Sequence, residues 1–143
     1  MDDGQRLFRD VVGDVKSWVP PESGENFEQS LYTFLSERVN IGKDGISRKE
    51  KTVEVKRNDE RPVITVGGSI GLDIVENFSE EDVEKTSDVL DESGLEFTIV
   101  IACGVEDVEA WKEFTVNHRG TRTSDTQTDL VWKEKQFFGQ TTY

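Results

Sequence analysis

One stretch decides the fold of this chain: Pro62-Val-Ile-Thr-Val-Gly-Gly-Ser-Ile-Gly-Leu-Asp-Ile-Val-Glu76, followed after an acidic segment by Phe97-Thr-Ile-Val-Ile-Ala-Cys103. Two β-rich segments joined by a pair of glycines are typical of a β-hairpin. An acidic helix that leads into a strand with apolar residues on both faces indicates a crossover to a buried parallel strand. The sequence therefore predicts an α/β domain with a mixed central sheet.

Length and charge set the limits of this domain. The chain has 143 residues, which predicts a single domain over residues 1–143. Its net charge is −13, with 33% charged and only 34% apolar residues. Molar salt shortens the screening length to about 3 Å and removes most of the repulsion between surface carboxylates. We therefore expect a halophilic protein, with an acidic mesophilic protein as the alternative.

The single cysteine and the single histidine exclude two kinds of site. Cys103 and His118 can form neither a disulfide within the chain nor a Cys/His zinc centre. The first residues lack the basic and then apolar pattern of an export signal, and no apolar run is long enough to span a membrane. We expect no membrane association and no bound cofactor. The expected location is the cytoplasm of a high-salt cell or a virion.

Residue periodicity predicts the remaining elements. Apolar residues at three- and four-residue spacing indicate helices over residues 5–19, 27–39, 79–92 and 105–115. Alternation indicates further strands over residues 52–57 and 130–132, with the polar residues 119–128 as a loop. We expect the helix at 79–92 to be the most exposed and the last helix to cover the opposite face of the sheet.

Asp73 is the unusual residue of the central hairpin. Alternation places Ile70, Leu72 and Ile74 on one face of their strand and Asp73 with Val75 on the other. An ionised carboxylate on a central strand needs a partner, because burial of an unpaired charge is costly. A basic neighbour or a hydroxyl would satisfy it, and so would a metal ion.

The element order resembles a known architecture. Two helices, three antiparallel strands, a helix, a strand, a helix and a strand resemble the PD-(D/E)XK nuclease fold of restriction-endonuclease-like proteins. The chain is similar in particular to a group of small haloarchaeal proteins of that class. The segments that carry the resemblance are 27–35, 69–75, 101–111 and 130–135. It implies a three-layer restriction-endonuclease-like fold, with a mixed central sheet of about five strands flanked by helices.

The resemblance also implies a degenerate catalytic motif. Active members hold a divalent metal with an acid on the second strand and an acid-x-Lys motif on the third, where the lysine helps to position the attacking water. Val63 stands at the first position, and Val75 replaces the lysine that should follow Asp73. Glu28 matches an acid that often joins the metal site. If the site were active, it would bind Mg²⁺ through Glu28 and Asp73.

A second reading of the motif remains open. Glu54-Val-Lys56 is a literal acid-x-Lys and would complete a catalytic set with Glu28 and Asp73. Alternating charges on the solvated face of a strand produce the same pattern. Glu28, for its part, can be an ordinary exposed acid near the N-terminus of a helix.

Charge bears on the choice of partner. The segment 73–96 is strongly acidic and would repel phosphates. Basic residues that could contact a DNA backbone are Arg48, Lys49, Lys56, Arg57, Arg61, Arg119 and Arg122. Molar salt would remove most of that affinity, so DNA is possible but disfavoured.

The last residues suggest a different kind of contact. Phe137, Phe138 and Tyr143 lie outside any periodic element and could insert into a pocket of a neighbour. We expect protein partners or a homo-oligomer, with the chain acting as a structural or assembly component of a halophilic archaeon or its virus. The alternatives are a metal-dependent DNA endonuclease with an atypical active site and a non-catalytic DNA-binding protein.

Overall fold

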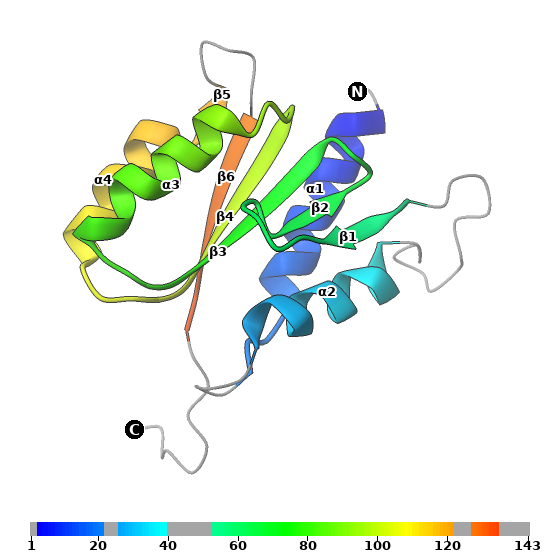
Figure 1. The fold of residues 1–143 in the computed structure, drawn as a ribbon, viewed down its shortest axis with the longest axis horizontal. Coiled ribbons are helices and arrows are strands. Elements are labelled where there is room, and N and C mark those ends of the chain that lie inside the picture. Colours follow the sequence, from blue (N-terminus) through cyan, green and yellow to red (C-terminus); the bar gives the residue numbers. More distant parts are fainter. Residues whose placement is uncertain (1–2, 22–25, 40–52, 122–126, 135–143) are drawn as a thin grey trace.

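The computed structural model describes residues 3–21, 26–39, 53–121 and 127–134. These residues form helices on both sides of a six-stranded sheet of order β1-β2-β3-β4-β6-β5 (Figure 1). The helices are α1 (Asp3–Ser17), α2 (Phe27–Arg38), α3 (Glu80–Glu92) and α4 (Val108–His118). The strands are β1 (Val55–Arg57), β2 (Ile64–Val66), β3 (Ile70–Phe78), β4 (Phe97–Val105), β5 (Gly120–Thr121) and β6 (Gln127–Lys133). The α/β class with a mixed central sheet is confirmed.

Strand directions follow the predicted hairpin and crossover. β2 and β3 are antiparallel and meet at Gly67 and Gly68, whose φ angles are 62° and 74°. Two successive positive φ angles belong to a tight hairpin turn that glycine adopts without steric cost. β4 lies parallel to both β3 and β6, so α3 and α4 each belong to a crossover connection. β1 and the two-residue β5 pair antiparallel with β2 and β6 at the two edges.

The four helices form two layers (Figure 1). α1 and α2 pack with Ile70, Leu72 and Ile99 on one face of the sheet. α3 and α4 pack with Val75 and Val100 on the other. The prediction that the last helix covers the opposite face from the helix at 79–92 is therefore wrong. Two crossovers of the same hand that step in the same direction along a sheet place both helices on one face.

Several element boundaries also differ from the predictions, and two of them have a local cause. α4 begins at Val108 rather than residue 105, because β4 continues to Val105 and Asp107 caps the helix by accepting a hydrogen bond from the Ala110 amide at 3.1 Å. β6 begins at Gln127, inside the predicted loop. There Thr128 forms a buried hydroxyl–hydroxyl hydrogen bond of 2.9 Å with Thr98 of β4.

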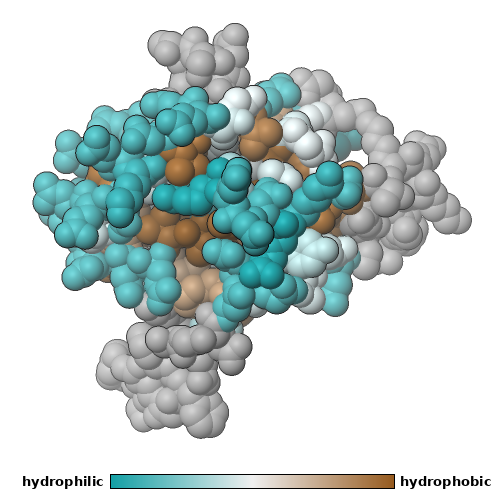
Figure 2. Space-filling view, viewed as in Figure 1, coloured by the Kyte–Doolittle hydropathy of each residue, from teal (hydrophilic) through white to brown (hydrophobic). Residues whose placement is uncertain are grey.

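α3 has fewer buried side chains than any of the other three helices, which agrees with the prediction of an exposed helix, although α4 has a similar share of exposed residues. The first turn of α3 carries a capping box between Ser79 and Asp82, with three acids near the positive end of the helix dipole. Its only buried side chains are Thr86 and Leu90. Figure 2 shows that hydrophilic residues dominate this side of the molecule. Within the described segments, no helix has the length and apolar character needed to cross a bilayer.

Candidate functional site

Asp73 is the most deeply buried acid in the described chain. It lies in the middle of β3, on the face covered by α3 and α4, and is 2% exposed. Ile70 and Leu72 point to the other face, as the alternation predicts. A carboxylate in this position is stable only if its charge is compensated by a nearby partner.

The partner of Asp73 is Arg61. The guanidinium donates from Nε to Oδ1 at 2.9 Å and from Nη2 to Oδ2, so both carboxylate oxygens are engaged. Paired hydrogen bonds of this kind are the strongest arrangement between arginine and a carboxylate. They raise the pKa of Arg61 further above its ordinary value, and the more distant charge of Asp82 on α3 adds to the effect. The cation that the carboxylate requires is therefore already supplied by the protein.

The motif positions beside this pair carry no ligand groups. Val63 and Val75, which stand where the resemblance implies an acid and a lysine, are both 6% exposed and apolar. Among the described residues, no group of three or more acids, histidines or cysteines is arranged to hold a metal ion. Asp73 thus has Arg61 as its neighbour at the position where the resemblance implies a metal ion.

Glu28 lies in the other layer of the molecule. It is in the first turn of α2, where Asn26 caps the helix. Arg57 of β1 approaches it at 3.8 Å from Nη2 and donates from Nη1 to Gln29 Oε1 at 3.0 Å. Because α2 covers the face opposite to Asp73, the structure does not bring the two candidate metal ligands together.

Glu54 and Lys56 lie at the solvated edge of the sheet. Their side chains are 72% and 61% exposed, and Lys56 Nζ lies 3.8 Å from Glu54 Oε1. An exposed ion pair of this kind contributes little to stability. The alternation of charge on a solvated strand accounts for this acid-x-Lys pattern without a catalytic role.

The basic residues of the described chain do not form one surface. Near the β1 edge, Arg57 contacts Glu28 and Gln29. Arg61, from the same end of the sheet, is paired with Asp73. Arg119 lies near the β5 edge, where it approaches Asp129 at 3.4 Å and donates to the Leu130 carbonyl at 2.6 Å. Arg48, Lys49 and Arg122 lie outside the described residues, as do Phe137, Phe138 and Tyr143.

One buried polar pair was not predicted from the sequence. His118 is 7% exposed, and its Nδ1 lies 2.9 Å from the Phe114 carbonyl, which can only accept a hydrogen bond. Nδ1 therefore carries the proton in the neutral ring, and Nε2 accepts from the Ser87 hydroxyl at 2.8 Å. This hydrogen bond fastens α4 to α3. Ser87 and His118 are 31 residues apart on two different helices, so their contact cannot be predicted from a single sequence.

Comparisons with protein-family models, with curated proteins and with solved structures found no match.

Proposed function

We propose that this chain is a catalytically degenerate PD-(D/E)XK domain of a halophilic archaeon or its virus, which acts through protein contacts as a structural or assembly component. The observation that carries the proposal is the paired hydrogen bond of Arg61 to Asp73 on the central strand. The element order and the mixed sheet support the nuclease architecture.

Phosphodiester hydrolysis makes demands that this arrangement does not meet. A metal-dependent nuclease needs carboxylate oxygens free to bind a cation, and it needs access for water and for the phosphate. Asp73 offers neither, because Arg61 occupies both oxygens and the residue is 2% exposed. A divalent ion would have to displace a guanidinium that is already well placed to compensate the charge.

The surface charge favours protein partners over nucleic acid. Acids dominate the exposed residues of α3, where the only base is Lys85. Such a surface repels phosphates at any salt concentration at which charge is not fully screened. A role in an assembly, with a protein partner or a second copy of the chain, agrees with this surface. A fold that has lost its site does not carry its former activity.

A cleavage assay tests this proposal against a metal-dependent DNA endonuclease that uses Glu28, Asp73, Glu54 and Lys56. Plasmid and single-stranded DNA are incubated with the protein in molar KCl with Mg²⁺ or Mn²⁺. We expect no cleavage by the wild type. Cleavage that is abolished by Asp73→Ala and retained by Asp59→Ala, a matched change at an exposed acid, would overturn the proposal.

Two further measurements address the partner. Light scattering in molar KCl gives the mass of the particle, and we expect self-association or co-purification in a defined complex. Gel shifts with duplex DNA test the DNA-binding alternative. That alternative requires a salt-dependent shift lost on Arg57→Ala and Arg61→Ala, whereas we expect no shift because both guanidiniums are engaged within the protein.

A further inference from the structure

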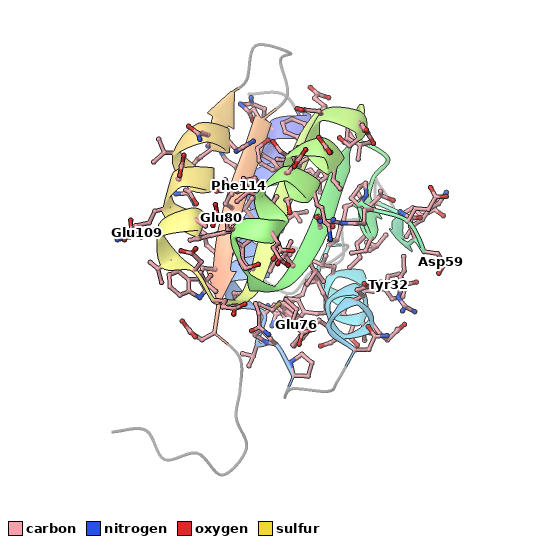
Figure 3. All side chains as sticks on the ribbon, turned by 60° about the vertical axis from the view of Figure 1, so that its left-hand side comes forward. Tyr32, Asp59, Glu76, Glu80, Glu109 and Phe114 are labelled. Carbon is pink, nitrogen blue, oxygen red and sulfur yellow. The ribbon has the colours of Figure 1, made fainter. Side chains whose placement is uncertain are left out.

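A groove runs between α3 and α4 on the outer face of the molecule. The two helices lie side by side, and Figure 3 shows Glu80 and Phe114 in the space between them. Two cavities of about 640 and 470 Å³ follow this line. Both are lined by Glu80, Asp107 and Glu109, so they adjoin. The first residues of both helices line the larger cavity, which places the two N-termini at the same end of the groove.

The floor of the groove is apolar. Half-buried Val83 of α3 and Ala110 of α4 line the smaller cavity, and Phe114, which also lines it, is 1% exposed and belongs to the apolar cluster under these helices. At the open end, Val108 lines the larger cavity and is 39% exposed. These side chains are spaced along neighbouring helices, so apolar side chains from a third helix would find room between them.

Both walls of the groove are acidic. The lining carboxylates are Glu80, Glu81 and Glu84 on the α3 side and Glu106, Asp107, Glu109 and Glu113 on the α4 side. No lysine or arginine lines either cavity. Asp107 is engaged as the cap of α4. Where salt does not fully screen them, like charges on facing walls repel one another, and an occupant of opposite charge would relieve that repulsion.

We propose that this groove, lined by the residues named above, docks a cationic amphipathic helix of a protein partner. Apolar side chains on one face of the helix would cover Val83, Ala110 and Val108, while lysines or arginines on its flanks would meet the acidic walls. Nucleic acids and anionic membranes are disfavoured occupants because their phosphates would face the same carboxylates. This inference rests on the proposed function and names the chemistry of the partner.

The test uses two synthetic peptides and the full chain. One peptide places leucines on one helical face and lysines on both flanks; the other has the same composition in scrambled order. Binding is followed by fluorescence anisotropy at the lowest KCl concentration at which circular dichroism shows a folded protein. We expect the amphipathic peptide to bind at least about tenfold more tightly than the scrambled one.

Matched variants separate the groove from overall charge. Glu84→Lys with Glu113→Lys changes one residue on each wall and should weaken binding by about tenfold or more. Glu37→Lys with Glu92→Lys makes the same change in net charge at exposed positions outside the groove and should leave the affinity within about twofold. Ala110→Gln alters the floor without changing charge and should weaken binding as well.

Equal affinities for the two peptides, or equal losses in the two charge variants, would overturn the inference, because binding would then report charge alone. Retention of full affinity by Ala110→Gln would overturn the role of the floor and with it the docked helix. Neither result touches the proposed function, which Asp73-dependent cleavage would overturn. The two proposals can therefore fail separately.

Discussion

The two faces of the sheet bury different kinds of side chain. Under α1 and α2 lies a large apolar cluster built from residues such as Trp18, Leu31 and Ile99. Under α3 and α4 the apolar cluster is smaller. The buried polar residues of the described chain are Asp73, Thr86, Thr98, His118 and Thr128, and strand alternation and helix membership place all of them on the α3–α4 face.

The difference suggests separate roles for the two faces, stability for the α1–α2 face and recognition for the α3–α4 face. Apolar burial is the main source of folding free energy, so the α1–α2 face should determine whether the chain folds. A buried polar pair is costly to break, but the buried polar pairs together contribute less to the free energy of folding than apolar burial does. The α3–α4 face also carries the acidic groove, so its role in our account is recognition. The following predictions test that division.

The largest loss of stability is expected in the α1–α2 layer. Leu31 on α2 is fully buried, so Leu31→Ala should lower the free energy of unfolding by about 3 kcal/mol. Val83→Ala on α3 removes a half-buried side chain and should cost about 1 kcal/mol. Chemical denaturation in constant molar KCl measures both. Equal losses would contradict the proposed difference between the faces.

The Arg61–Asp73 pair should respond unequally to loss of either partner. Arg61→Ala leaves a carboxylate that is 2% exposed without its cation and should cost about 2 to 3 kcal/mol. Asp73→Asn should cost less, about 1 kcal/mol, because the Arg61 side chain is 36% exposed and can turn toward water. Denaturation curves of the two variants give the comparison. A larger loss of stability in Asp73→Asn than in Arg61→Ala would contradict this explanation, which attributes the cost to a buried, unpaired carboxylate.

The Thr98–Thr128 hydrogen bond offers a smaller test on the same face. Thr98→Val leaves the Thr128 hydroxyl buried without a partner and should cost about 1 kcal/mol. Replacing both threonines with valine removes both polar groups and should restore most of the lost stability. Thermal unfolding of the three variants measures this. Additive losses in the double variant would contradict the explanation.

The smallest effect is expected at the exposed pair on β1. Glu54→Ala and Lys56→Ala should each change stability by less than about 0.5 kcal/mol, since both side chains are largely solvated. We expect no DNA cleavage by the wild type and none by either variant. Cleavage by the wild type that is lost in either variant would instead assign the changed residue to an active site.

Local signals in the sequence were sufficient for the hairpin, the crossover and α3. Gly67 and Gly68 require positive φ angles, and Ser79 with Asp82 forms a capping box, so each feature is encoded by neighbouring residues. The alternation that placed Asp73 opposite to Ile70 is likewise a local property of β3.

The features that could not be predicted from the sequence depend on contacts between elements that are distant in the chain. The sequence predicts Arg61 as a possible DNA contact from its charge alone, since its hydrogen bonds to Asp73 depend on how β2 and β3 align. In that register Ile64 pairs with Leu72, which brings the residues just before β2 toward Asp73. The placement of α4 beside α3, and with it the groove and the Ser87–His118 hydrogen bond, follows from the direction of the crossovers.

The central claim of the proposed function is that Asp73 is paired with Arg61 and does not bind a metal ion. Titration with Mn²⁺ in molar KCl, followed by the amide NMR resonances, tests it most directly, because a bound paramagnetic ion broadens signals near its site. We predict no selective broadening at Leu72, Asp73 or Ile74. Broadening centred on Asp73 and lost in Asp73→Ala would contradict the account.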